Sequence, residues 1–394
     1  MHAIVVGAGP AGLATAIALR RAGISVTVYE RGDGPRRKGN GLTVWPNGMA
    51  ALDSIGAGDA VRCGGLPAPG MAMRSASGTV LYEVSAPAMD TVGGNGIALH
   101  RADLQAALQG LLEPGTVRFG ARCLGARTGA GRAVAIFADG TEAEADLVVG
   151  ADGIRSAVRT AAGLGGRLRY GGFVVWRATI AFPLAPTPGL LSLGGDGQFG
   201  IWRLPGERVY WFASVPAAEG THRRGRSRPP AAFARWHDPI PALLAATTDE
   251  QLVVNDIYDC RPLPSWSRGR IVLVGDAAHP SMPNMGQGTS QAFEDAAVLA
   301  GSLRSAATVE VALREYHARR RRRAAAAASQ ARMLAMVGKW RNPLACWARE
   351  RMISSAPQRV QLRQLRQLFA FDQPGGAEAS RLATPSGEDL AFPP

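Results

Sequence analysis

The chain has 394 residues, of which 46% are hydrophobic and 19% charged, and it carries a formal net charge of +13. A chain of this length can bury a large core and is expected to form two domains. Its four cysteines have neither CxxC nor histidine-paired spacing, so the sequence indicates neither a zinc site nor a disulfide framework, and a reducing cytoplasm fits best.

The first thirty residues predict a strand, a tight turn, a helix and a second strand. An apolar run, residues 3–6, leads into Gly7-Ala8-Gly9-Pro10-Ala11-Gly12, and residues 13–19 continue as an apolar helix. In such a turn Gly7 permits the bend, Gly9 lets the backbone approach a pyrophosphate and Gly12 allows close helix packing. The second strand, residues 25–29, ends at Glu30, where a carboxylate can accept ribose hydroxyls. The alternative is a glycine-rich turn without a ligand. The dinucleotide interpretation gives these cofactor-binding residues: Gly7, Gly9, Ala11, Gly12, Glu30 and Arg31.

Short β-type runs dominate the middle of the chain. Residues 173–180, 198–203 and 209–213 predict strands, and Pro205-Gly206-Glu207 between the last two predicts a hairpin. Residues 71–84, with a turn at Ser77-Gly78, are expected to add a second hairpin to the same mainly antiparallel sheet.

A second ligand-binding pattern follows this sheet. Residues 270–274 form an apolar strand that brings Gly275 and Asp276 to its end, where Asp276 can hydrogen-bond the ribityl chain of a flavin. A loop with Pro283, Gly286 and Gly288 then leads into a helix that starts at Thr289. The N-terminus of that helix would favour negative charge on a reduced flavin ring.

Nearly all of the positive charge lies near the C-terminus. Residues 314–370 contain fourteen Lys and Arg against two acids, Glu315 and Glu350. This segment predicts helices, in which the Arg run 319–323 forms a solvated face and residues such as Met333, Leu344 and Trp347 pack inward. The alternative is a site for a polyanion.

Three motifs in this order resemble those of the class A flavoprotein monooxygenases, whose members hydroxylate 4-hydroxybenzoate, salicylate or urate. They are the glycine fingerprint, Asp152-Gly153 and Gly275-Asp276. The resemblance covers residues 1–300 strongly and the helical tail weakly. It implies FAD as cofactor, NAD(P)H as co-substrate, and hydroxylation or epoxidation of an electron-rich aromatic or polyketide-like molecule by O2 through a C4a-hydroperoxyflavin. The chain has no second GxGxxG placed on a strand-turn-helix, which agrees with the family's transient binding of the nicotinamide nucleotide.

The resemblance also assigns roles to individual residues. Asp152 and Arg155 would serve both FAD and the pyridine nucleotide, and Arg101 matches the arginine near the FAD pyrophosphate. Pro283 would form a wall beside the reacting flavin atom. Gly41, in Gly39-Asn40-Gly41, would border the isoalloxazine. The preceding residues, Arg36, Arg37 and Lys38, would meet the nicotinamide nucleotide or form a solvated loop.

Arg177 and Tyr210 are the candidates for the substrate site, because they are polar residues on strands that face the substrate in several relatives. Arg203 is a third candidate. The alternative is that Tyr210 is a half-buried sheet aromatic and Arg177 a member of a structural ion pair. For His279 the choice lies between a general base and a side chain packed behind the loop.

The expected fold is α/β with a discontinuous Rossmann-like FAD-binding domain, an antiparallel substrate sheet and a helical C-terminal tail. The predicted boundaries are 1–70, 97–165 and 265–330 for the FAD-binding domain, 71–96 and 166–264 for the substrate domain, 331–372 for the C-terminal helices, and 373–394 for a disordered tail.

Two other functions remain open at this point. A flavin-dependent halogenase shares the fold, but the Trp-x-Trp-x-Ile-Pro stretch expected of it is missing from the sequence. A non-enzymatic adaptor could bind a polyanion through the basic C-terminal segment. The favoured interpretation is an enzyme with a small aromatic substrate, no nucleic-acid or membrane partner, and a monomeric or homodimeric state. No apolar run apart from the fingerprint region approaches the length of a bilayer span.

Overall fold

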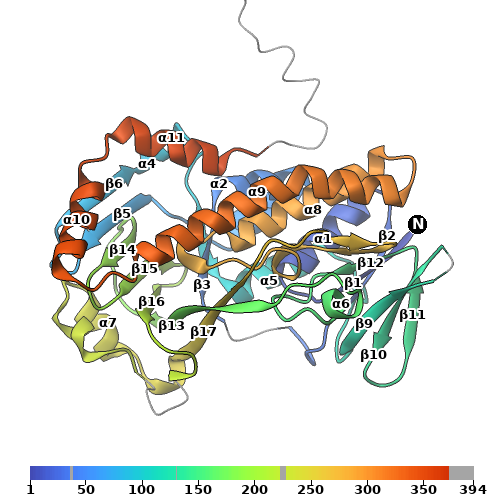
Figure 1. Ribbon diagram of the computed structural model, residues 1–394, viewed down its shortest axis with the longest axis horizontal. Coiled ribbons are helices and arrows are strands. Elements are labelled where there is room, and N and C mark those ends of the chain that lie inside the picture. The colour runs from blue at the N-terminus through green and yellow to red at the C-terminus, as the bar shows by residue number, and fades with distance from the viewer. Residues whose placement is uncertain (36–38, 130, 222–227, 372–394) are drawn as a thin grey trace, which may run out of the picture.

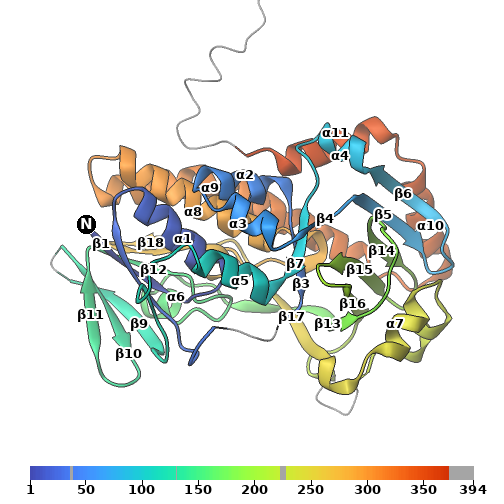
Figure 2. The same cartoon turned by 180° about the vertical axis from the view of Figure 1, so that it is seen from behind.

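The computed structural model describes residues 1–35, 39–129, 131–221 and 228–371. The basic residues 36–38 and the predicted tail 373–394 lie outside the described residues. Figures 1 and 2 show two sheets at opposite ends of the molecule, with the long helices α8 (Gly288–Ser305) and α9 (Val309–Val337) along one side. Helix α9 extends from the first sheet to the second, so the predicted boundary between residues 330 and 331 falls inside this helix.

The first sheet has six strands in the order β18-β19-β12-β1-β2-β8. Its centre is parallel, because β1 pairs in parallel with both β2 and β12, and β12 pairs in parallel with β19. Residues Ala3, Ile4 and Val5 have no exposed surface, as expected for a parallel strand covered on both faces. The strands are β1 (His2–Val6), β2 (Ser25–Tyr29), β8 (Val117–Arg118), β12 (Leu147–Gly150), β18 (Ser267–Arg268) and β19 (Ile271–Leu273). The predicted Rossmann-like lobe is confirmed.

Helices and two small sheets complete this lobe. The antiparallel sheets β11-β10-β9 and β3-β7-β4 were not among the predicted elements. Their strands are β3 (Gly41–Val44), β4 (Leu66–Pro67), β7 (Ile97–His100), β9 (Cys123–Thr128), β10 (Ala133–Phe137) and β11 (Glu142–Ala145). The other helices of the lobe are α1 (Pro10–Arg21), α2 (Pro46–Ser54), α3 (Gly58–Cys63), α5 (Arg101–Gln109) and α6 (Ala157–Ala161).

The second sheet has seven strands in the order β17-β13-β16-β15-β14-β5-β6. All neighbours are antiparallel except β14 and β5, so the predicted sheet type is confirmed. Both predicted hairpins also form, since β15 pairs with β16 and β5 with β6. The strands are β5 (Gly70–Ser75), β6 (Val80–Ser85), β13 (Leu168–Ala181), β14 (Gly189–Leu193), β15 (Gln198–Leu204), β16 (Arg208–Pro216) and β17 (Val253–Cys260).

The two faces of this sheet have different partners. One face packs on the 3-10 helix η2 (Ala231–Arg235) and on α7 (Ile240–Ala246), with Ile201 and Trp211 in that core. The opposite face carries Trp202 and Tyr210, which pack against Ala98 of β7. Because side chains alternate along a strand, Arg203 shares the face of Ile201 and is turned away from Tyr210. The three substrate-site candidates therefore do not share one face, since Arg203 lies on the side opposite to Arg177 and Tyr210.

The C-terminal helices form as predicted, but their packing differs from the prediction. Helix α9 is followed by α10 (Pro343–Ser354) and α11 (Gln358–Phe369), and α4 (Ala86–Asp90) lies near them. Alanines such as Ala324, Ala327, Ala331 and Ala335 occupy the buried side of α9. Because these small residues let the helix approach closely, the larger apolar side chains point outward. The expected inward packing of Met333, Leu344 and Trp347 is wrong, since they are 60%, 77% and 66% exposed.

Candidate functional site

The glycine fingerprint separates into packing glycines and a glycine beside open space. Gly7 has φ +105°, and a Cβ placed on it would lie 2.6 Å from the carbonyl oxygen of Ala151. A Cβ on Gly12 would lie 1.8 Å from the carbonyl oxygen of Gly7. A Cβ on Gly9, in contrast, meets no described atom within 4 Å. Helix α1 starts here without a side-chain cap from the described residues, so its N–H groups can bind a phosphate.

Glu30 lies beside the fingerprint at the end of β2. Its carboxylate accepts the backbone N–H of Ala8 at 2.8 Å and that of Gly32 at 3.0 Å. These bonds fix the orientation of the carboxylate, and each oxygen retains a lone pair for a hydroxyl group. Arg31, the next residue, is exposed.

The Gly275-Asp276 motif meets the fingerprint helix in space. Gly275 has φ +58°, and a Cβ placed on it would lie 3.0 Å from the Cβ of Ala11 on α1 and 3.1 Å from that of Ala292 on α8. Asp276 is accessible to solvent, yet protein surrounds it closely enough that desolvation raises the pKa of its carboxyl. The nearby charges of His279, Arg101 and Arg159 oppose that increase in pKa.

The loop that follows this motif and two unpaired polar atoms from the segment after the fingerprint fit a bound ring system. The 3-10 helix η5 (Pro283–Met285) ends at Gly286 in the left-handed region, and α8 begins two residues later without a side-chain cap from the described chain. The buried Trp45 Nε1 and Asn40 Oδ1 have no hydrogen-bond partner among the described residues. A Cβ on Gly286 would lie 2.9 Å from Trp45 Nε1. Unsatisfied buried groups of this kind indicate a ligand, and an isoalloxazine edge offers matching donors and acceptors. Thr289 lies in the first turn of α8.

Asp152 and Arg155 lie between β12 and α6. The carboxylate of Asp152 accepts the N–H groups of Ala157 and Val158, at 2.7 and 3.1 Å, and so caps α6. Its Oδ1 is buried and has no partner among the described residues. Arg155 is exposed, and its guanidinium lies 5.7 Å from the ring centroid of Tyr258.

Arg159 is a residue of this region that the sequence did not single out. It is 4% exposed and donates to the carbonyl oxygens of Ala277, at 2.9 Å, and Ile154, at 2.6 Å. It therefore ties the Asp152-Gly153 loop to the Gly275-Asp276 loop. No spacing pattern distinguishes this arginine from the many others in the chain. Arg101 at the start of α5 packs beside Gly39, where an added Cβ would lie 3.2 Å from the Arg101 Cβ.

The structure brings Arg177, Tyr210 and Gly41 together. Tyr210 is 9% exposed, and the positive charge of Arg177 acts on its hydroxyl. Burial raises the pKa of Tyr210, and the positive charge of Arg177 only partly offsets this. A Cβ on Gly41 would lie 2.3 Å from the Tyr210 Cβ, so β3 packs directly on this tyrosine.

The same sheet face reaches the proline loop. Met282 and Met285, on either side of Pro283, pack in one cluster with Val175 and Phe212. Phe212 pairs with Arg177 across the strands, and Thr179 pairs with Tyr210. The buried hydroxyl of Thr179 has no partner among the described residues. This face therefore combines an aromatic wall with a few polar groups, next to the loop that carries Pro283.

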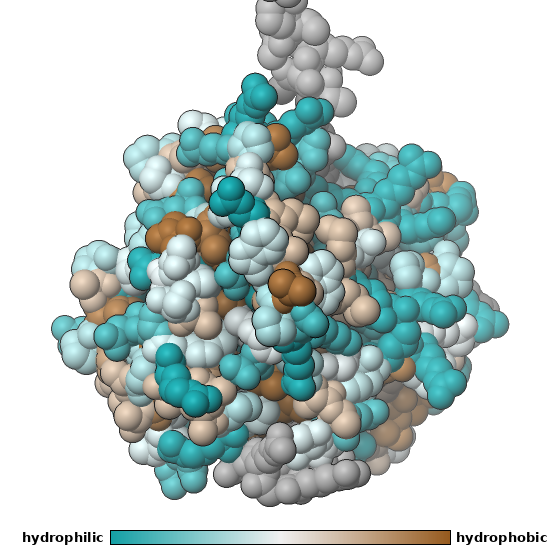
Figure 3. Space-filling view, turned by 60° about the vertical axis from the view of Figure 1, so that its left-hand side comes forward, coloured by the Kyte–Doolittle hydropathy of each residue, from teal (hydrophilic) through white to brown (hydrophobic). Residues whose placement is uncertain are grey.

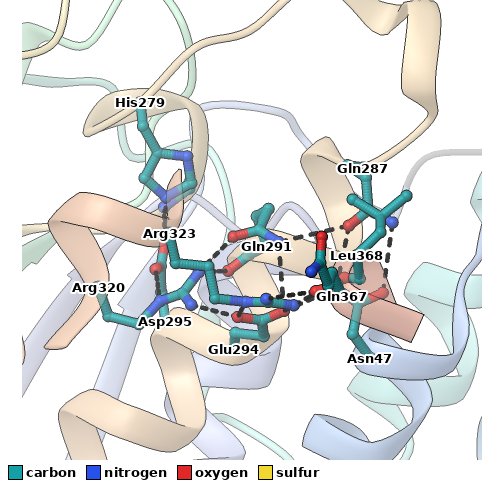
Figure 4. A network of polar contacts seen from close by, with 11 residues as sticks. Asn47, His279, Gln287, Gln291, Glu294, Asp295, Arg320, Arg323, Gln367 and Leu368 are labelled. Carbon is teal, nitrogen blue, oxygen red and sulfur yellow. Dashed lines mark hydrogen bonds and ion pairs between the residues drawn. The ribbon is translucent and has the colours of Figure 1, made fainter. Parts of the chain in front are cut away.

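A buried polar network lies behind the Gly275-Asp276 loop, at the centre of Figure 4. Asp295 of α8 accepts the N–H of Gly275 at 2.8 Å, and its Oδ2 lies 2.5 Å from His279 Nε2. Arg320 of α9 donates to Asp295 at 2.8 Å and also pairs with Glu294. His279 thus packs behind the loop, as one of its two interpretations expects. The predicted solvated face of the Arg run is wrong for Arg320, which is 2% exposed.

The network extends to α2 and α11. Glu294 also binds Arg323, at 2.6 and 2.8 Å, and the amide of Asn47, at 2.7 Å. Arg323 in turn donates to the carbonyl oxygen of Leu368 at 2.9 Å. The sequence contained one signal for it, the adjacent acids Glu294 and Asp295, which stand between apolar residues in α8.

The comparison with known proteins agrees with this geometry. Residues 1–331 match the family model described as an FAD binding domain. The chain belongs to this FAD-binding family. It is 37% identical over 373 residues to the aurachin C monooxygenase/isomerase of Stigmatella aurantiaca, which covers 93% of this chain and 97% of the relative. It is 34% identical over 331 residues to the FAD-dependent urate hydroxylase of Klebsiella pneumoniae subsp. pneumoniae, with coverage of 81% and 85%.

A solved structure supports the same assignment. Klebsiella pneumoniae HpxO, crystallised with FAD and uric acid, superposes with a TM-score of 0.87 at 29% identity and covers 94% of this chain and 96% of its own. The chain is therefore an FAD-dependent monooxygenase, and the predicted fold, family and cofactor are confirmed. Within the described residues no helix is long and apolar enough to cross a membrane.

Proposed function

We propose that FAD binds from the fingerprint to the Gly275-Asp276 loop and that the substrate lies between the flavin and the sheet face of Arg177 and Tyr210. The buried Tyr210 and the partly exposed Arg177 on an aromatic face carry this proposal, because ligand sites combine apolar and aromatic walls with a few polar groups that orient the ligand. The proposed substrate is a planar, electron-rich aromatic molecule with an oxygen on its ring. The relatives named for urate and aurachin C support a heteroaromatic substrate of this kind.

The cofactor contacts follow the sequence prediction. We assign the pyrophosphate to the start of α1 with Arg101, the ribose to Glu30, the ribityl chain to Asp276, and the isoalloxazine to Gly41 and to the loop from Pro283 to Thr289. Open space at Gly9 and the uncapped starts of α1 and α8 support these positions. When bound, FAD would supply the redox chemistry, in which NAD(P)H is oxidised and O2 is activated.

The protein side chains act on the substrate. Because burial raises the pKa of Tyr210, its hydroxyl keeps its proton near neutral pH and can donate to the ring oxygen. The positive charge of Arg177 favours the ionised form of this oxygen, which donates electron density to the neighbouring ring carbon and so makes that carbon reactive toward an electrophilic oxygen. Trp202 and Phe212, whose rings are stacked at 5.7 Å, keep water away from the reacting atoms.

Two further proposals concern the co-substrate and the assembly of the enzyme. NAD(P)H would approach from the surface at Arg155, close to the Asp152 loop, without a nucleotide-binding fold of its own. We also propose a cytoplasmic enzyme that acts as a monomer or homodimer.

The test compares three variants of the FAD-loaded enzyme. NAD(P)H consumption is measured with urate, salicylate, 4-hydroxybenzoate and aurachin C as candidate substrates, and product formation is followed for any that stimulates it. Arg177→Met and Tyr210→Phe should lower kcat/KM about ten- to a hundredfold without loss of bound FAD. Arg203→Met is the matched control, because Arg203 lies on the opposite face of the same sheet. Equal effects in all three variants would refute the proposed substrate face.

A further inference from the structure

Helix α10 presents large apolar side chains to solvent. Leu344, Trp347 and Met352 are 77%, 66% and 59% exposed, whereas Cys346 and Arg349 on the inner side of the helix are buried. A surface helix normally has the reverse pattern, with apolar residues inward and charged residues outward. Since this outer face is not covered by any of the residues that the structure describes, its composition indicates an external partner.

The end of α9 extends this surface. Met333, Met336 and Trp340 are 60%, 51% and 40% exposed. Together with the three α10 residues they form what we call the C-terminal patch. Figure 3 views this end of the molecule, where hydrophobic side chains interleave with hydrophilic ones on the surface.

The C-terminal patch is fixed to the seven-stranded sheet. Arg341, between α9 and α10, donates to the carbonyl oxygen of Pro216 at 2.7 Å. The ammonium group of Lys339 lies 5.0 Å from the ring centroid of Phe173 on β13. A Cβ on Gly338 would lie 2.1 Å from Gln198 Nε2 on β15. The patch is thus part of the folded body, not a loose tail.

Positive charge predominates in the chain segment that carries the patch. Residues 339–371 contain seven Lys and Arg against a single acid, Glu350. Arg351 lies on the exposed face of α10, and Arg359 and Arg363 are exposed on α11. Within the described part of the chain these three arginines are in no ion pair.

Charge decides between the partners that an apolar surface can have. In a symmetric dimer this surface would face its own copy and bring the arginines of both copies together, which is repulsive. A nucleic acid would satisfy the arginines but would leave Leu344 and Met352 without an apolar partner. A bilayer with anionic headgroups satisfies both, because tryptophan, leucine and methionine enter the interface while arginine binds phosphate.

We propose that the C-terminal patch docks the enzyme on the surface of an anionic lipid membrane. The side chains of the patch enter the headgroup region, and Arg351, Arg359 and Arg363 bind lipid phosphates. The sequence-based expectation of no membrane partner rests on the lack of a spanning segment, and docking at the surface requires none.

Sedimentation with vesicles tests the proposal on the full-length, FAD-loaded enzyme. Vesicles of phosphatidylcholine with one-third phosphatidylglycerol are compared with vesicles of phosphatidylcholine alone. We expect binding to the anionic vesicles that weakens as salt is added. The double variant Leu344→Ser/Trp347→Ser should weaken binding by about tenfold or more, since it removes apolar groups from the interface. Arg351→Gln/Arg359→Gln/Arg363→Gln should weaken it by about fivefold for each arginine.

Leu124→Ser is the matched control, because Leu124 on β9 is 53% exposed at the other end of the molecule. Retained FAD absorbance and an unchanged melting temperature show that each variant is folded. The proposal is overturned if the native enzyme does not bind anionic vesicles, or if the patch variants bind as well as Leu124→Ser. It is also overturned if light scattering shows a dimer that Leu344→Ser/Trp347→Ser dissociates, since the patch would then be an interface between copies.

Discussion

Arg320 should hold the Gly275-Asp276 loop in place from a distance, and replacing it tests this directly. Its guanidinium donates to Asp295 and Glu294 and to the backbone and side-chain oxygens of Gln291. Asp295 in turn accepts the N–H of Gly275. Arg320→Met keeps a side chain of similar length but removes every one of these donors.

The size of the effect follows from burial. Asp295 and Glu294 have no exposed surface, so the substitution leaves buried carboxylates with fewer partners. Removing one member of a buried ion pair typically costs about 3–5 kcal/mol. Arg322→Met is the matched control, because Arg322 is an exposed neighbour in the same helix, and its effect should stay within about 0.5 kcal/mol.

Urea titration of both variants, followed by circular dichroism, gives the free energy of unfolding. The dissociation constant of FAD, measured by flavin fluorescence, reports on the loop. We expect Arg320→Met to lose stability by the amount above and to bind FAD more weakly. Equal stability and equal FAD affinity in the two variants would show that the network does not support the loop.

Three further predictions concern single positions. Gly9→Ala should leave the stability of the FAD-free protein unchanged yet weaken FAD binding, whereas Gly12→Ala should destabilise the FAD-free protein itself, as thermal melting with and without FAD can show. Burial raises the pKa of Tyr210 above its ordinary value of about 10, so ionisation of this hydroxyl should not lower kcat/KM below about pH 10. A fall in kcat/KM below that pH that is present in the native enzyme and absent from Tyr210→Phe would contradict this. Although burial alone would raise the pKa of Asp295, His279 and Arg320 hold it below its ordinary value of about 3.9. Its contribution to stability is therefore present above that pH and lost on further acidification, so Asp295→Asn should show a flatter fall in unfolding free energy below about pH 4.

Local patterns in the sequence were enough to predict β1, β2, β13, β19, the fingerprint turn and both hairpins, but not the strands of the two small antiparallel sheets. The run at residues 3–6, the glycines after it and Glu30 each depend on neighbours close in the chain. The proximity of Gly275 to α1 followed from the resemblance and is a tertiary contact that spacing does not encode. Predictions of single binding residues remain untested, and strand register, which composition does not encode, separates Arg203 from Arg177 and Tyr210.

Composition alone could not predict how α9 and α10 pack. Methionine, leucine and tryptophan usually pack inward, but here alanines form the inner side of α9, and Ala331 and Ala335 pack against Phe173 and Met282. Within the basic run Arg320 is fully buried and Arg323 partly buried. Their burial depends on ion pairs with Glu294 and Asp295, which lie on a different helix. A charge count assigns both arginines to solvent, since it contains no information on which helices meet.

Incorporation of labelled oxygen tests the central claim most directly. The FAD-loaded enzyme is supplied with NAD(P)H, with 18O2 and with any substrate that stimulates NAD(P)H consumption, and the product is analysed by mass spectrometry. The account predicts a product that carries one labelled oxygen atom, formed in proportion to NAD(P)H consumed, and less such product per NAD(P)H in Arg177→Met. NAD(P)H consumption that yields only hydrogen peroxide, or a product whose added oxygen comes from water, would contradict it.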